Sequence, residues 1–136
     1  MPKMGSRVAV LSLLAMMLGS CSYGYDIKAI AKNGSLVFTI GSSGLFGSRT
    51  PYVDYVLVEK IGKPTRLIWK LETQASNGPE MHELRYGEAP AKMKTVVGAA
   101  PLTVGQLYRA TFFTIDGGGE NQFVISDSGE VLNIPR

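Results

Sequence analysis

The chain has 136 residues, 45% of them hydrophobic, which is enough for one domain with its own core. The chain contains 14 lysines and arginines and 11 aspartates and glutamates. Two of the cations, Lys3 and Arg7, precede the first apolar run, which leaves 14 − 2 = 12 in the remainder. A remainder so near neutrality, without a basic stripe, excludes the nucleic-acid-binding class. The single cysteine, Cys21, excludes an intramolecular disulfide.

The start of the chain predicts a secretion signal. Its positive charges are followed by a largely apolar run, Val8 to Leu18, and then by two small residues. This is the layout of a signal peptide that is removed on export. As a helix, the run would be about 16 Å long, too short for a bilayer core of about 30 Å. A permanent transmembrane helix is therefore the weaker interpretation.

The four residues Leu18-Gly19-Ser20-Cys21 resemble the lipobox of bacterial lipoproteins. The resemblance implies that residues 1–20 are the signal and that residues 21–24 are a lipid anchor and short tether. It also implies that the Cys21 thiol receives a diacylglyceryl group, that the chain is cut between Ser20 and Cys21, and that the Cys21 amine exposed by this cut is acylated. Together these groups supply the several acyl chains that stable anchoring requires. The alternative is an ordinary signal cleaved nearby, with Cys21 incidental or removed.

Ser22 indicates in which membrane the lipidated protein is expected to reside. An aspartate directly after the lipidated cysteine resembles the inner-membrane retention signal of some Gram-negative bacteria, and this chain has Ser22 there instead. In such a host the expected location is the outer membrane, with the domain facing the periplasm.

Residues 25–136 predict one all-β domain. Short runs rich in β-branched and aromatic residues alternate with clusters of Gly, Pro, Asn, Asp and Ser. The expected strands are 25–31, 35–40, 52–60, 65–72, 81–86, 93–97, 107–115, 122–126 and 130–134.

Two of these strands carry most of the core prediction. In 65–72, Leu67, Trp69 and Leu71 alternate with mostly polar residues, which predicts one buried face anchored by Trp69. The run 52–60 is apolar on both faces, as expected of a central or well-covered strand. Its predicted faces are Val53, Tyr55 and Leu57 on one side and Val56 and Val58 on the other.

The turns are predicted from residues that accept positive φ angles. Asn33-Gly34 predicts a tight type I′ hairpin. The three glycines Gly117-Gly118-Gly119 predict a second hairpin turn.

The segment Leu102-Thr103-Val104-Gly105-Gln106-Leu107-Tyr108 is similar to the Leu-x-Pro-Gly-x-x-Tyr turn before strand F of fibronectin type III domains, with Val104 in place of the proline. The resemblance covers 65–126. It implies an immunoglobulin-like (fibronectin type III-like) antiparallel β-sandwich, in which the Tyr108 hydroxyl bonds to backbone upstream. Such folds host many functions, so the resemblance implies architecture and not activity.

The sequence predicts no catalytic, cofactor or metal site. The glycine-rich stretch 41–48 lacks the Gly-Lys-Ser/Thr of a phosphate loop, although Leu45 and Phe46 within it are candidates for contact with lipid or a partner. His82 has no second histidine or free cysteine for a zinc set or a nucleophile pair. The stretch 116–121 lacks the acidic spacing of an EF-hand, so a hairpin turn is expected there rather than a calcium site.

These observations favour a non-enzymatic adaptor or structural binding module, held to the membrane through Cys21 and docked to an envelope protein whose identity the sequence does not encode. One alternative is a small-ligand carrier, which would need a cavity of about 300 Å³ or more with converging polar groups. Another is a weak envelope enzyme that uses Asp116, Glu120 and His82.

Overall fold

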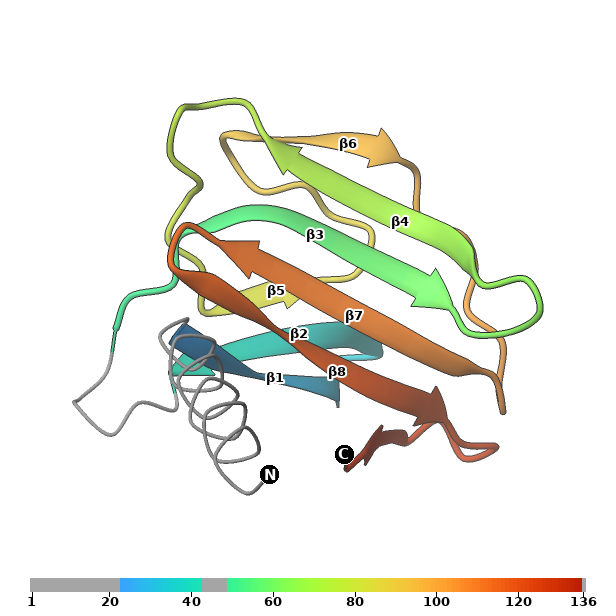
Figure 1. Ribbon diagram of the computed structural model, residues 1–136. Helices are drawn as coiled ribbons and strands as arrows, with labels where there is room; N and C mark the ends of the chain where they lie inside the picture. The colour runs from blue at the N-terminus through green and yellow to red at the C-terminus, as the bar shows by residue number, and fades with distance from the viewer. Residues whose placement is uncertain (1–22, 43–48, 136) are drawn as a thin grey trace, which may run out of the picture.

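The computed structural model describes residues 23–42 and 49–135. All regular structure in these residues is β-strand, as predicted, and they contain no helix of the length and apolarity that a membrane crossing requires. The strands are β1 (Tyr23–Lys32), β2 (Ser35–Ser42), β3 (Val53–Lys60), β4 (Arg66–Thr73), β5 (Glu83–Arg85), β6 (Met93–Val97), β7 (Leu107–Thr114), β8 (Gly117–Ile125) and β9 (Val131–Ile134) (Figure 1). Most bounds lie within two residues of the expected ones. The exception among these strands is β8, which starts five residues earlier than 122.

The strands form a mixed sheet in the order β5-β2-β1-β8-β7-β3-β4-β6, with β9 paired to the end of β8. The expectation of purely antiparallel pairing is wrong at one place, because β1 and β8 pair in parallel at Tyr23–Gly117 and Gly24–Gly118. Beyond these two pairs β1 leaves β8, and the sheet curls into a half-barrel around its core (Figure 1).

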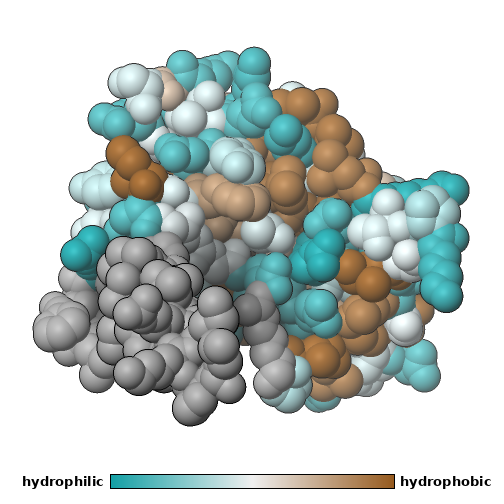
Figure 2. Space-filling model, viewed as in Figure 1, coloured by the Kyte–Doolittle hydropathy of each residue, from teal (hydrophilic) through white to brown (hydrophobic). Residues whose placement is uncertain are grey.

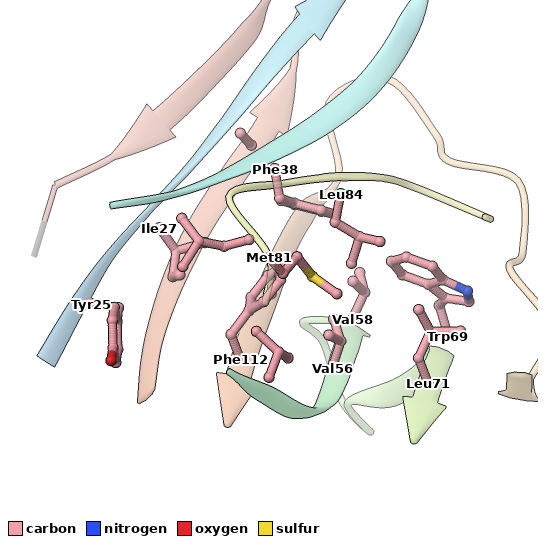
Figure 3. Close-up of a cluster of buried hydrophobic side chains, with 14 of the residues drawn as sticks. Tyr25, Ile27, Phe38, Val56, Val58, Trp69, Leu71, Met81, Leu84 and Phe112 are labelled. Carbon is pink, nitrogen blue, oxygen red and sulfur yellow. The ribbon is translucent and has the colours of Figure 1, made fainter. Parts of the chain in front are cut away.

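The curl is visible in the contacts across the core. Phe38 of β2 meets Phe112 of β7 and Phe123 of β8, with ring centroids 5.7 and 5.6 Å apart, although β2 neighbours neither strand in the sheet. Figure 3 shows buried side chains from β1, β2, β3, β4 and β7 pointing into one shared interior. Trp69 lies there with 0% of its surface exposed, so the prediction that it anchors the core is confirmed.

Two bulges move side chains away from their predicted faces. The register between β3 and β7 shifts between Val53 and Tyr55, which buries Val53 with Val56 and Val58 and leaves Tyr55 on the outside. A second shift, where Trp69 and Leu67 pair with consecutive residues of β3, leaves Leu67 exposed. The predicted grouping of these residues is therefore wrong, because one extra residue in a strand reverses the alternation beyond it.

The tight hairpin at Asn33-Gly34 is confirmed, with φ angles of 51° and 76°. The turn predicted at the three glycines is wrong. Thr114 pairs with Gly117, so the turn between β7 and β8 is Ile115-Asp116 and the glycines lie inside β8. Gly119 is needed there for a close approach instead, because a Cβ at this position would lie 2.2 Å from the backbone oxygen of Tyr25.

We expect Gly119→Ala to destabilise the domain by about 1–3 kcal/mol, because the new methyl group would overlap β1, whose backbone has no room to move without disturbing the core. Gly41→Ala is the matched control, since its Cβ would meet only the Asp26 backbone oxygen at 3.8 Å. That change should be neutral or stabilising by up to about 1 kcal/mol. Urea unfolding followed by Trp69 fluorescence measures both. Equal midpoints for the two variants would contradict the close packing of β1 on β8.

The turn before β7, Leu102 to Tyr108, contains the predicted hydrogen bond between the Tyr108 hydroxyl and the backbone. The Tyr108 hydroxyl accepts a hydrogen bond from the backbone N–H of Thr103 at 2.7 Å. Its ring is buried and stacks on Phe123, with centroids 5.5 Å apart. The bond therefore ties the loop before β7 to the core.

We expect Tyr108→Phe to lower the free energy of unfolding by about 1 kcal/mol, because it removes one hydrogen bond and keeps the ring. Tyr52→Phe is the control, since the Tyr52 side chain is exposed. Chemical denaturation of both variants checks the difference, and an unaltered midpoint for Tyr108→Phe would show that the bond contributes nothing.

Candidate functional site

Three of the residues singled out from the sequence lie outside the described residues, namely Cys21, Leu45 and Phe46. The described residues nearest to Cys21 in the chain are those of β1, which begins at Tyr23, two residues before the expected start.

The structure does not assemble the residues considered for catalysis. His82 is exposed, and its Nε2 lies 2.9 Å from Oε1 of Glu80. His82 precedes β5, and its backbone oxygen accepts a hydrogen bond from β2. Glu120 lies on β8, and β1 separates β8 from β2 in the sheet. In the described part of the chain, no three acidic, histidine or cysteine side chains cluster as a metal site would require.

Asp116 ties the β7–β8 turn to β1. Its carboxylate accepts hydrogen bonds from the Tyr25 hydroxyl at 3.1 Å and from the Thr114 hydroxyl at 2.8 Å, and Arg49 Nη1 lies 3.4 Å away. Burial alone would raise the pKa of Asp116, but the hydrogen bonds from Thr114, Tyr25, its own backbone and Arg49 outweigh burial and lower the pKa. The carboxylate is thus held in its charged form as a structural acceptor.

We expect Asp116→Asn to destabilise the domain by about 1 kcal/mol at neutral pH, since it removes charge-assisted bonds at a partly exposed site. The folded state holds the pKa of Asp116 below its unfolded value of about 4. The contribution is therefore complete above that value and is lost as pH falls through the folded pKa. The difference between the variant and the wild type should shrink in acid, and unfolding at about pH 7 and about pH 3 measures it.

Asp127→Asn is the control for this pH series, because Asp127 is exposed in the turn before β9. A gap between Asp116→Asn and wild type that stays constant or widens in acid would rule out the charged-acceptor role.

The outer face of β3 and β7 has an aromatic centre that the sequence did not reveal. The rings of Tyr55 and Phe113 stack with centroids 4.2 Å apart and an interplanar angle of 21°, and Tyr55 is 37% exposed. Leu57 follows on the same face of β3. Figure 2 shows apolar side chains gathered among hydrophilic ones on this side of the molecule. We call the group Tyr55, Leu57 and Phe113 the aromatic face.

Charged pairs border the aromatic face. Arg109 Nη2 lies 3.0 Å from Glu59 Oε1, and Lys70 Nζ lies 3.0 Å from Glu72 Oε1. An apolar aromatic centre with a polar rim is the anatomy of a protein–protein interface, and aromatic residues are enriched where such interfaces bind most strongly.

A groove of about 540 Å³ opens where β1 leaves β8. It is lined by 26–28 of β1, 120–122 of β8 and 133–135 at the end of β9. The Asn133 amide bonds both the N–H and the C=O of Ala29, at 2.8 and 2.9 Å, in the manner of a neighbouring strand. Within the described residues, the buried Oδ1 of Asn121 has no hydrogen-bond partner.

Comparisons with protein-family models, with curated proteins and with solved structures found no match for this chain.

Proposed function

We propose that this chain is a lipid-anchored protein of a bacterial cell envelope whose β-domain binds another envelope protein and catalyses no reaction. The observation that carries the proposal is Leu18-Gly19-Ser20-Cys21 placed directly before β1. The domain would then be tethered by Cys21 and would present the aromatic face to its partner. An outer membrane, with the domain in the periplasm, is the proposed location in a Gram-negative host.

We also propose that the fold is an immunoglobulin-like sandwich of the fibronectin type III kind. The pairing β1-β2-β5 opposite β8-β7-β3-β4 supports it, since it matches the order of strands A, B and E opposite G, F, C and C′. The bond from Thr103 to Tyr108 supports it further, as the tyrosine corner of that family. The additional strand β6, between β5 and β7 in the chain, departs from the family pattern.

The absence of a catalytic role is supported by the placement of the ionisable groups. Asp116 is engaged by hydroxyl and guanidinium donors, and His82 sits beside Glu80 on the surface. Neither lies in the arrangement of nucleophile, base and orienting group that acyl or glycosyl transfer needs.

The anchor is tested by the intact mass of the protein extracted from the membrane fraction. The expected result is a chain that begins at Cys21 and carries the mass of several acyl groups. A chain that begins elsewhere, or a free Cys21 thiol, would contradict the anchor.

The binding role is tested by photo-cross-linking in intact cells. A photoreactive phenylalanine analogue at Tyr55 keeps the stack on Phe113 and should give a discrete cross-linked species. The same analogue at Ser128, in the exposed turn before β9, is the control and should give none. A cross-link absent at Tyr55, or equally strong at Ser128, would argue against the aromatic face as the binding surface.

A small-ligand carrier is the second candidate, favoured by the groove at β1, β8 and β9 and by the unpartnered Oδ1 of Asn121 beside it. Because this oxygen is buried, a ligand in the groove would satisfy it with a donated hydrogen bond once the Asn121 side chain turned toward the groove. Native mass spectrometry of the purified protein tests this candidate. A bound small molecule that Asn121→Leu removes would favour the carrier, and a wild-type protein without any bound mass would oppose it.

A further inference from the structure

The turn between β7 and β8 exposes an apolar side chain at its tip. Ile115 is 72% exposed, more than any other large hydrophobic residue of the described part of the chain. Tight turns are normally made from Gly, Asn, Asp, Pro and Ser, whereas isoleucine favours strands. Its neighbour Asp116 is turned toward Tyr25 and Thr114, so the tip presents the isoleucine and not the acid.

The proposed anchor leaves the domain at this same tip. Tyr23 pairs with Gly117, the residue that closes the β7–β8 turn, and Figure 1 shows the start of β1 and this turn at one end of the molecule. Only Ser22 separates Cys21 from Tyr23. Two residue steps span at most about 7 Å, so acyl chains on Cys21 must enter the bilayer close to the turn.

We propose that the β7–β8 turn rests on the lipid surface and that Ile115 inserts into it. This inference rests on the proposed lipid anchor, and it assigns the surface of the domain that meets the membrane. An apolar side chain held within reach of acyl chains loses contact with water when it enters the headgroup region.

The opposite end of the domain would then point away from the membrane. Val104 lies there, in the turn before β7, whose eight residues span about 27 Å at about 3.4 Å per residue. The backbone bond from Gly105 to Ile125 places this turn at the far end of β8 as well. Val104 is 49% exposed, so it is a matched apolar position that should stay in water.

The test uses the full lipidated protein in vesicles of phosphatidylethanolamine and phosphatidylglycerol. Ile115→Cys and Val104→Cys each introduce one thiol for a nitroxide spin label, while acylation blocks Cys21. Electron paramagnetic resonance then measures collisions of the label with oxygen, which enters the bilayer, and with a nickel complex, which stays in water. We expect a several-fold loss of nickel accessibility at position 115 relative to 104, with higher oxygen accessibility at 115.

Mass spectrometry of the labelled protein distinguishes failure of the proposed docking of the turn from failure of the proposed lipid anchor. One label per chain, with vesicle binding and equal nickel accessibility at both positions, would overturn the docking of the turn while leaving the anchor intact. Shielding at 104 instead of 115 would overturn it as well. Two labels per chain would show that Cys21 is free, and the anchor and this inference would fall together.

Discussion

Replacing Cys21 with serine is expected to abolish retention of the protein in the membrane fraction through acyl chains. A serine hydroxyl does not take the place of the thiol that receives the diacylglyceryl group in the family that the lipobox resembles. The later acylation depends on this transfer of the diacylglyceryl group, so the variant should carry none of the several acyl chains that stable anchoring requires. The variant should therefore accumulate as uncleaved precursor or as soluble protein.

Ser22→Ala is the matched control for this experiment, because it changes the adjacent residue and keeps the thiol. Fractionation of cells, followed by the intact mass of each species, reads out both variants. Retention of Cys21→Ser at the wild-type level, together with a wild-type chain that carries no acyl mass, would disprove the anchor.

Local patterns in the sequence were sufficient for the class of fold and for its best-defined turns. Alternating apolar residues predict strands because side chains in a strand point to opposite faces. Asn33-Gly34 predicts its turn because both residues tolerate positive φ. Trp69 was identifiable as a core residue from its place among alternating leucines, and Tyr108 from its spacing to Gly105.

The faces of β3 and β4 were not predictable, because they depend on bulges that leave no local signal. Asp54 lies in an apolar run where nothing marks an extra residue, yet the shift beside it turns Tyr55 outward. Ile68 marks the second shift, and again its neighbours look like a regular strand. A one-residue slip exchanges the two faces of a strand, so small errors in register become large errors in the predicted surface.

The candidate sites were beyond sequence reasoning for a similar reason. The aromatic face joins Tyr55 and Phe113, which are far apart in the chain and become neighbours only through the pairing of β3 with β7. The groove is lined in part by Asn133, which reaches β1 through its bond to Ala29, a contact across 104 positions. The glycines of β8 resemble a turn locally. Only the close approach of the Phe112 backbone to Gly118 and of the Tyr25 backbone to Gly119 shows why glycine is needed inside this strand.

Replacing Trp69 with alanine is expected to cost about 3–5 kcal/mol of unfolding free energy. The side chain is fully buried, and its ring meets Tyr86 edge-on at 4.9 Å between centroids. Total stabilities of small domains are about 5–15 kcal/mol, so this single change removes a large share. Because the variant has no tryptophan, unfolding is followed by circular dichroism.

Two further variants decide whether the cavity is the cause of that loss. Trp69 Nε1 is buried without a hydrogen-bond partner among the described residues, so removing it offsets part of the cost. Trp69→Phe removes the same nitrogen but keeps most of the volume, and we expect it to cost clearly less than Trp69→Ala. Leu67→Ala, two residues away on β4 but exposed, should cost little. If Leu67→Ala were as damaging as Trp69→Ala, the bulge that separates their faces would be wrong, and with it the outward placement of the whole β3–β4 surface.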